Sequence, residues 1–394
     1  MSSPAYKMVG LLAASQALLL TNGITILAVT GLAGATLSSN KSLATLPMTT
    51  LVLGATLSTI PASLAMRSLG RRTGFTIGGS CGMAGAMLAV YALSASSFTL
   101  LCLATFLAGI YAAFGQFYRF AAADVADAYA PDFKARAISL VLAGGIVGGV
   151  LGPELSKITR DLLPTVFAGT YAMLAVCAAV SVVLIQLLDL PAPTQEEMHG
   201  PSRPLSEIMR QPVFIVALVG AMTAYGGMNF LMNATPLAMQ ICAYPYKDIA
   251  FILEWHVIGM FLPSFFTGSW IKRFGVLPVM AAGAVLMLLC IAVALTGVQL
   301  TQFWFALVLL GVGWNFLYIG STTLLTTSYT PAEKAKVQGI NDFLVSGILL
   351  VGSYSSGMLV LSHGWFHVNK LAIPFVALGG LAVAILAFRR RNAA

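Results

Sequence analysis

Long apolar stretches alternate with short polar segments along the whole chain. The twelve stretches lie near residues 8–31, 43–66, 74–96, 98–122, 137–157, 165–188, 212–236, 249–271, 276–298, 303–327, 338–361 and 371–388. Because a helix of about 20 apolar residues spans the hydrocarbon core of a bilayer, each stretch is predicted to be a transmembrane helix. The first has neither a basic start nor a small-residue cleavage site, so it is predicted to remain in the mature protein.

The composition supports this pattern. Hydrophobic residues make up 58% of the chain and charged residues only 9%, which is too little polar surface for a soluble globule. The sequence therefore predicts an all-α integral membrane protein.

Basic residues are distributed unequally between the two sets of loops. Of the 21 lysines and arginines, 15 fall on one side of the predicted membrane and five on the other, while Arg119 lies inside a stretch. The positive-inside rule then predicts that both termini are cytoplasmic. The net charge of +8 reflects this topology, and no nucleic-acid partner is implied.

The sequence carries no pattern typical of an enzyme. Its five cysteines are scattered singly without a C-x-x-C pair, so no disulfide framework is indicated. No Ser/His/Asp arrangement, phosphate loop or pair of carboxylates at catalytic spacing is present. We expect neither chemistry on a substrate nor a bound cofactor.

The chain repeats itself at an offset of about 200 residues, with Pro131-x-x-Lys134-Ala135-Arg136 matching Pro331-x-x-Lys334-Ala335-Lys336. The most polar stretch, residues 189–211, lies between the two copies and is rich in proline. This organisation predicts an N-terminal six-helix bundle over residues 1–188, a cytoplasmic linker over 189–211 and a C-terminal six-helix bundle over 212–394.

Two six-helix repeats, short basic loops and a central linker resemble the major facilitator superfamily. Gly70-Arg71-Arg72 matches the end of that family's G-x-x-x-D-R-x-G-R-R loop, although Arg67 stands close to the place of the aspartate. The resemblance implies twelve helices in two bundles, transport by alternating access, and function as a monomer within the lipid bilayer. Asp124 or Asp127 is expected to replace the missing acid in the cytoplasmic gate.

Ionisable residues inside a membrane are costly and are therefore candidates for function. The candidates of this kind are Arg119, Asp124, Asp127, Glu254 and Asp342. We expect them to form a gating network or to couple transport to an ion.

Two neighbouring stretches carry pairs of soft metal ligands, Met228 with Met232 and His256 with Met260. Residues four apart share one face of a helix, and thioether with imidazole suits Cu(I). Met239 and Cys242, further along the chain, are candidate accessory ligands. The alternative is that these methionines only fill gaps in helix packing.

The same pairs resemble those of the CcoA-type copper importers of the superfamily, which carry Met-x-x-x-Met in the seventh span and His-x-x-x-Met in the eighth. Trp255-His256-Val257-Ile258-Gly259-Met260 resembles that subgroup. The resemblance implies copper import into the cytoplasm across a bacterial inner membrane, with delivery to copper acceptors that supply cbb3-type cytochrome c oxidase. It assigns Met228, Met232, His256 and Met260 as ligands and makes copper the substrate. His363 and His367 in the last outer loop either capture metal or are simply solvated.

Two other functions stay open. Close relatives of these importers are thought to carry riboflavin, which needs aromatic and amide groups around a larger cavity. Residues able to supply them are Gln116, Tyr225, Asn229, Trp255, Trp314 and Asn315. An efflux pump for lipophilic compounds is the third possibility, and it follows from fold analogy alone.

Overall fold

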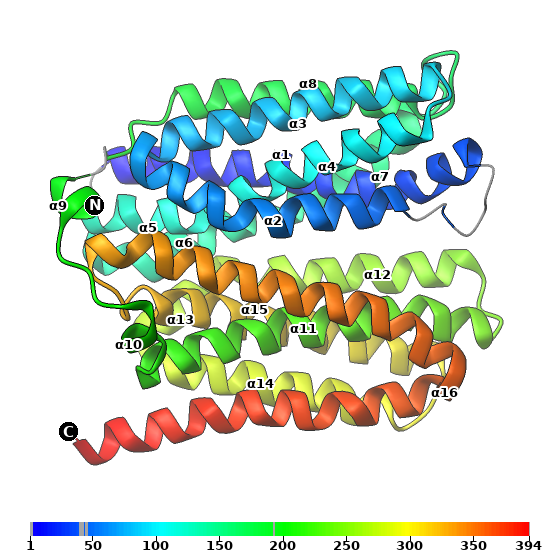
Figure 1. Ribbon diagram of the computed structural model, residues 1–394. Coiled ribbons are helices and arrows are strands. Elements are labelled where there is room, and N and C mark those ends of the chain that lie inside the picture. The colour runs from blue at the N-terminus through cyan, green and yellow to red at the C-terminus, as the bar shows by residue number, and fades with distance from the viewer. Residues whose placement is uncertain (1–2, 39–42, 44–45, 192–193, 394) are drawn as a thin grey trace. The chain divides into compact units, whose positions relative to one another are not determined.

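A computed structural model describes residues 3–38, 43, 46–191 and 194–393 of the chain, and these are almost entirely helical (Figure 1). The longer helices in chain order are α1 (Ser3–Leu37), α2 (Leu46–Leu69), α3 (Arg71–Ser94), α4 (Phe98–Gly115), α5 (Tyr118–Tyr129), α6 (Lys134–Ala143), α7 (Gly145–Thr159), α8 (Ala168–Gln186), α11 (Pro212–Ile241), α12 (Tyr246–Phe261), α13 (Ser264–Phe274), α14 (Val276–Ala294), α15 (Leu300–Leu325) and α16 (Lys334–Ala393). Two short helices, α9 (Gln195–His199) and α10 (Leu205–Met209), follow α8 in the polar segment. No strand occurs in the described ranges.

These helices confirm the predicted fold class. Eleven helical spans within the described residues are long and apolar enough to cross a membrane. The predicted stretches 338–361 and 371–388 both lie in α16, which turns at Gly364 without a loop. Glycine suits this turn because the backbone φ of Gly364 is +80°, a value that residues with a Cβ adopt only under strain. The predicted outer loop around His363 and His367 is therefore wrong, and both histidines lie in helical segments.

Three predicted spans consist of two consecutive helices. The break between α12 and α13 falls at Pro263, which lacks the N–H needed to continue the ladder of hydrogen bonds. The break between α6 and α7 falls at Gly144, in the glycine-rich segment. The third break separates α4 from α5 at Gln116 and Phe117.

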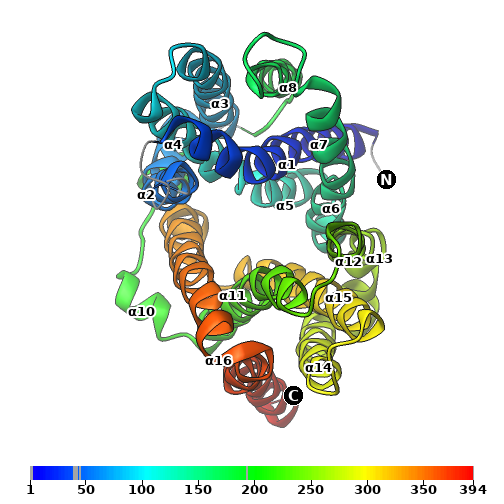
Figure 2. The same ribbon diagram turned by 90° about the vertical axis from the view of Figure 1, so that its right-hand side faces the viewer.

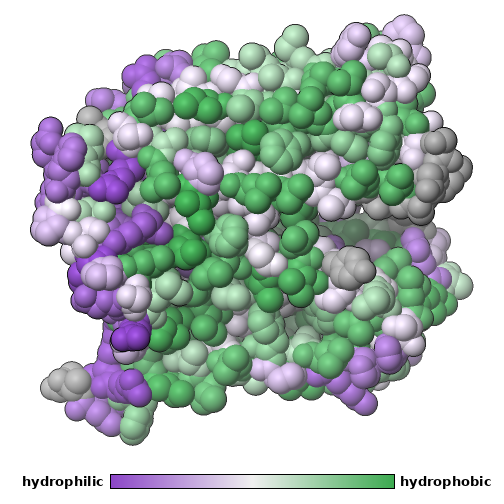
Figure 3. Space-filling view, viewed as in Figure 1, coloured by the Kyte–Doolittle hydropathy of each residue, from purple (hydrophilic) through white to green (hydrophobic). Residues whose placement is uncertain are grey.

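Large hydrophobic side chains cover much of the surface of the helices. Ile158 and Leu361 are 73% and 70% exposed, and Met87 is 60% exposed. Figure 3 shows hydrophobic residues over the lengths of the helices, whereas hydrophilic residues gather mainly near helix ends. A soluble monomer rarely exposes so much apolar surface, so these side chains are suited to contact with lipid.

The helices group into two compact units by their contacts. The first unit comprises Met1–Pro131, Gly144–Pro201 and Pro331–Phe343, and the second comprises Asp132–Ala143, Ser202–Thr330 and Leu344–Ala394. The predicted bundles, 1–188 and 212–394, differ from these units by two exchanged segments. The segment that includes α6 packs within the second unit, and the start of α16 packs within the first. Both segments contain the basic end of an internal repeat copy, Lys134-Ala135-Arg136 in one and Lys334-Ala335-Lys336 in the other.

Each exchanged segment makes a close contact that pairs a serine with a glycine. In the first unit, Ser63 of α2 donates a hydrogen bond of 2.6 Å to the carbonyl oxygen of Ala335. A Cβ atom added at Gly339, one turn further along α16, would lie 3.1 Å from the Ser63 Cβ. The small residues allow α2 and α16 to approach closely.

The second unit contains the corresponding contact with the two residue types exchanged. Ser139 of α6 donates to the carbonyl oxygen of Ser264 and accepts a hydrogen bond of 3.1 Å from the Gly268 N–H. A Cβ added at Gly268 would lie 2.5 Å from the Arg136 Cα, which is backbone. Because backbone cannot move aside cheaply, this position requires glycine.

Candidate functional site

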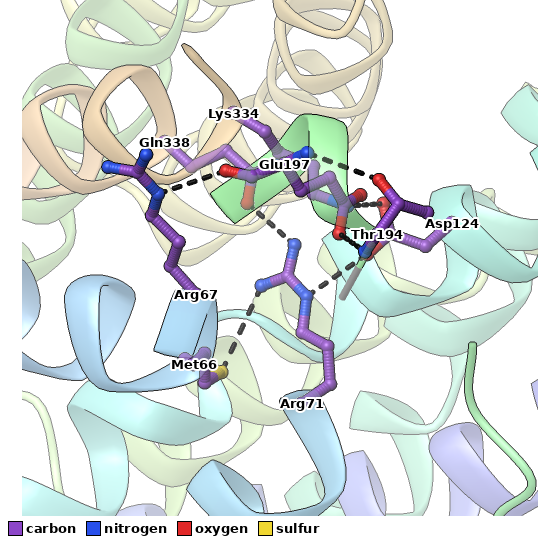
Figure 4. Close-up of polar contacts among 8 residues, drawn as sticks. All are labelled: Met66, Arg67, Arg71, Asp124, Thr194, Glu197, Lys334 and Gln338. Atoms are coloured by element: carbon purple, nitrogen blue, oxygen red, sulfur yellow. Dashed lines mark hydrogen bonds and ion pairs between the residues drawn. The ribbon is translucent and has the colours of Figure 1, made fainter. Parts of the chain in front are cut away.

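Charged side chains of the first unit form a network at one end of its helices (Figure 4). Arg71, at the start of α3, donates a hydrogen bond of 3.0 Å to Asp124 Oδ2 of α5 and one of 2.8 Å to Gln338 Oε1 of α16. Lys334 Nζ lies 3.3 Å from the other carboxylate oxygen of Asp124. Asp124 therefore joins two cations from two different helices.

The network continues into α9, in the polar segment predicted as a linker. Glu197 accepts a hydrogen bond from Lys334 and forms a capping box with Thr194. Arg67 of α2 donates to the carbonyl oxygens of Glu197 and Met198, at 3.0 and 2.6 Å. These bonds satisfy carbonyls at the end of α9 that have no partner within the helix. The short helix is thereby fixed to α2 and α16.

A second ion pair in the first unit is almost fully buried. Arg119 Nη2 lies 2.5 Å from Asp342 Oδ1, and the two side chains are 2% and 5% exposed. Arg119 also donates to the backbone and side-chain oxygens of Gln116, at 2.9 and 3.0 Å, and Asn341 donates to Asp342 Oδ1 at 2.8 Å. Burial without such partners is costly for either charge.

The five ionisable residues predicted from the sequence lie in three different environments. Asp124 is in the network and Arg119 pairs with Asp342, whereas Asp127 and Glu254 are exposed. The network also contains Glu197, which the sequence reasoning missed. Thr194-x-x-Glu197 is a capping-box pattern that indicates a helix start, but it gives no sign of the distant partner.

The predicted metal ligands on α12 face another helix. His256 is completely buried, and its Nδ1 lies 2.8 Å from the carbonyl oxygen of Leu307 in α15, which requires a proton on Nδ1. The Nε2 atom has no partner within the described residues. A Cβ added at Gly311 of α15 would lie 2.8 Å from the Met260 backbone nitrogen. The α12 face that carries His256 and Met260 thus packs tightly on α15.

The remaining predicted ligands vary in exposure. Met228 and Met239 of α11 are buried, Met232 is half-buried, and Cys242 just beyond α11 is exposed. No group of three or more histidine, cysteine, aspartate or glutamate side chains that could hold a metal occurs in the described part of the chain. A copper site would therefore depend mainly on thioethers. The rings of His363 and His367 stack 4.9 Å apart and are exposed.

Aromatic side chains gather in the second unit where α11 meets α15. The half-buried Tyr225 meets Trp314 and Tyr318 edge-on, at centroid distances of 5.3 and 4.6 Å. Trp314 stacks on Tyr318 at 5.2 Å. Such offset and edge-to-face contacts stabilise aromatic clusters beyond their burial of apolar area.

An amide cluster lies along α11, next to the aromatic residues. Asn229 donates hydrogen bonds to the Leu349 carbonyl oxygen and to Ser353 Oγ of α16, at 3.0 and 2.6 Å. Asn233 donates to Asn229 Oδ1 and to Ser353 Oγ, at 3.1 and 3.2 Å. Of the three polar side chains in this cluster, Asn229 was predicted from the sequence, whereas Asn233 and Ser353 were not. A search for amides at intervals of four residues finds Asn233.

Two other residues proposed from sequence for a riboflavin site have different surroundings. Asn315 is completely buried, and its amide donates to the Met260 carbonyl and to Ser264 Oγ, at 2.6 and 2.5 Å. Its hydrogen bonds tie α15 to the break between α12 and α13. Trp255 is 38% exposed and meets Trp304 edge-on, in a group of surface aromatic residues.

Comparisons with known proteins agree on the kind of molecule. The family model described as Major Facilitator Superfamily matches residues 11–253 and 217–394. The chain is similar to a protein of Brucella anthropi named riboflavin transporter RfnT, with 39% identity over 396 residues that cover 100% of this chain and 98% of the relative. It is also 25% identical to the uncharacterized MFS-type transporter YddS of Bacillus subtilis, over 89% of this chain and 84% of that protein.

Solved structures show the same fold at low sequence identity. The transporter FucP in its outward conformation matches with a TM-score of 0.76 and 16% identity, over 97% of this chain and 98% of that one. A bacterial homologue of the iron transporter ferroportin matches with a TM-score of 0.75 and 13% identity, over 96% and 99%. Copper import, the function expected from the methionine and histidine pairs, finds no support in these comparisons.

Proposed function

We propose, from the premise that this chain belongs to the major facilitator superfamily, that it is a secondary transporter that carries riboflavin across a membrane. The observation that carries the proposal is the 39% identity to riboflavin transporter RfnT, which extends over the full length of this chain. The aligned region contains all the predicted spans, and therefore also the helices that would contact a substrate. The proposal replaces copper import with the riboflavin alternative.

The chemistry of riboflavin fits the side chains of the second unit. Riboflavin has a flat isoalloxazine ring with a polar edge and a ribityl chain of hydroxyl groups, so its carrier needs aromatic surface next to hydrogen-bonding groups. Tyr225 with Tyr318, and Asn229 with Asn233, supply these two kinds of group on adjoining parts of α11 and α15. This juxtaposition supports an organic substrate.

The distribution of charge supports a direction for the chain in the membrane. Fifteen lysines and arginines fall in the loops on one side and five in those on the other. By the positive-inside rule, we place both termini in the cytoplasm and the protein in the cytoplasmic membrane. The network of Arg71, Asp124 and Lys334 then lies at the cytoplasmic ends of the helices, where we propose that it acts as a gate during alternating access.

Complementation of a riboflavin auxotroph tests the proposal in cells. The chain is expressed in a bacterial strain that can neither make nor import riboflavin, with RfnT and an empty vector as controls. We expect growth at a riboflavin concentration too low to support the empty-vector strain. Growth of the RfnT strain alone, with the chain present in the membrane by immunoblot, contradicts the proposal.

A further inference from the structure

We infer that Asn233 of α11 recognises the polar edge of the isoalloxazine ring and that its side-chain oxygen accepts the hydrogen bond of the ring N3–H. The inference rests on the proposed transport of riboflavin and identifies a residue that determines specificity. It makes Asn229 and Ser353 positioning residues, which hold the Asn233 amide in place.

Tyr225, Asn229 and Asn233 are spaced four residues apart, so they lie in a row on one face of α11. All three side chains are half-buried, unlike Gly226, Gly227 and Met228 on the packed side of the helix. The row passes from an aromatic ring to two amides within about two turns of the helix. A flat ring with one polar edge presents the same sequence of groups.

Asn229 uses its hydrogen-bonding groups within the protein. Its Nδ2 donates to the Leu349 carbonyl oxygen at 3.0 Å and to Ser353 Oγ at 2.6 Å, and its Oδ1 accepts from Asn233 at 3.1 Å. Both amide hydrogens of Asn229 are thus engaged. This residue ties α11 to α16 and has no donor left for a ligand.

Asn233 is held by hydrogen bonds at its amide nitrogen only. Its Nδ2 donates to Asn229 Oδ1 at 3.1 Å and to Ser353 Oγ at 3.2 Å. Its Oδ1 accepts no hydrogen bond from any residue that the structure describes. This oxygen is also not fully enclosed by the protein. The two bonds at the nitrogen fix the orientation of the amide and leave its oxygen as an accessible acceptor.

This acceptor matches one feature of the isoalloxazine ring. The pyrimidine part of the ring carries a single N–H donor, N3–H, between two carbonyl oxygens. A side-chain amide oxygen held in a fixed orientation can accept this hydrogen bond without the entropy cost of ordering a free side chain. A site that bonds an N–H group discriminates against a ligand that lacks it, because the bound ligand covers the acceptor and leaves it without a partner.

N3-methylriboflavin is the probe for this hydrogen bond, since the methyl group replaces the N3 hydrogen. Initial rates of uptake are measured for riboflavin and for N3-methylriboflavin in proteoliposomes that contain the full chain or its Asn233→Ala variant. Loss of one hydrogen bond to a fixed acceptor corresponds to a change of up to about tenfold in KM. Gln240→Ala is the matched control, because Gln240 is an exposed amide further along the same helix.

The expected result is a specific loss of discrimination. In the unmodified protein, KM is about tenfold higher for N3-methylriboflavin than for riboflavin. Asn233→Ala raises KM for riboflavin to the value for the analogue, leaves KM for the analogue unchanged, and changes kcat by less than about twofold. Gln240→Ala preserves the discrimination. Equal increases in KM for both compounds in Asn233→Ala overturn the inference.

Two further measurements test the inference if the Asn233→Ala variant does not fold. The unmodified protein alone is informative, because equal KM values for the two compounds overturn the inference without any substitution. Ser353→Ala removes an acceptor from the Asn233 amide and is expected to reduce the discrimination by about half; a discrimination that stays intact counts against the positioning role. Riboflavin uptake without discrimination contradicts only this inference, whereas absence of riboflavin uptake contradicts the proposed function.

Discussion

The guanidinium of Arg119 lies 2.5 Å from the carboxylate of Asp342, and both side chains are almost completely shielded from the surroundings. The two residues are 223 positions apart and belong to the same compact unit. A phenylalanine ring, that of Phe120, lies 4.4 Å from the guanidinium carbon of Arg119. The Gln116 side chain accepts a further hydrogen bond from Arg119, and the Asn341 amide donates one to Asp342.

Removing one member of this pair is expected to destabilise the protein more than removing both. Arg119→Met leaves the Asp342 carboxylate buried without its cation, at a cost of about 3–5 kcal/mol. Arg119→Met combined with Asp342→Leu leaves no buried charge and is expected to recover most of that loss. Thermal stability in detergent, followed by fluorescence-detected size-exclusion chromatography, measures the difference. A double variant no more stable than the single one contradicts the pairing.

Gly268 is expected to tolerate no larger residue. A Cβ there would lie 2.5 Å from the Arg136 Cα and 2.6 Å from the Ala135 carbonyl oxygen, so Gly268→Ala forces α13 and α6 apart. We expect a loss of about 1–3 kcal/mol in thermal stability measurements. Gly347→Ala in α16 is the control, because nothing lies within 4 Å of a Cβ added at that position. Equal effects of the two substitutions count against the close contact.

The ion pair between Glu197 and Lys334 is expected to protect the segment around α9. Glu197→Gln removes the charge that Lys334 contacts, whereas Glu196→Gln removes an exposed carboxylate from the same short helix. Amide hydrogen–deuterium exchange followed by mass spectrometry is expected to be several times faster in α9 of Glu197→Gln than of Glu196→Gln, because exchange requires local opening. Equal exchange rates show that the ion pair does not hold the helix.

Hydrophobic patterning predicted the helices well because each span buries or exposes apolar side chains over about 20 consecutive residues. It failed at Gly364, where the outer loop expected between the last two spans is a single turn within α16. It also could not predict the exchange of α6 and the start of α16 between the units. Which helix a segment packs against depends on contacts that are distant in sequence.

The candidate site was harder to predict from sequence. The spacing of His256 and Met260 identifies one face of a helix, but it does not reveal that this face packs on α15. The same spacing rule links Asn229 to Asn233, yet only the structure shows that both share Ser353 as a partner. Glu197 and Lys334 lie 137 residues apart, so their contact leaves no local pattern.

Riboflavin transport is expected to need neither copper nor the thioethers first identified. Met232→Leu with Met260→Leu conserves side-chain volume and is expected to leave riboflavin uptake within about twofold of the unmodified protein. A Cu(I)-specific chelator in the assay is expected to have no effect. Uptake that falls on chelation and returns with added copper contradicts this view of the methionines.

Uptake of radiolabelled riboflavin by purified protein in proteoliposomes tests the proposed function most directly. The chain is reconstituted at known density, and empty liposomes measure passive leakage. We predict saturable accumulation of label above the empty liposomes that excess unlabelled riboflavin abolishes. Size-exclusion chromatography checks that the protein is folded. Accumulation by folded protein that is no greater than in empty liposomes contradicts riboflavin transport.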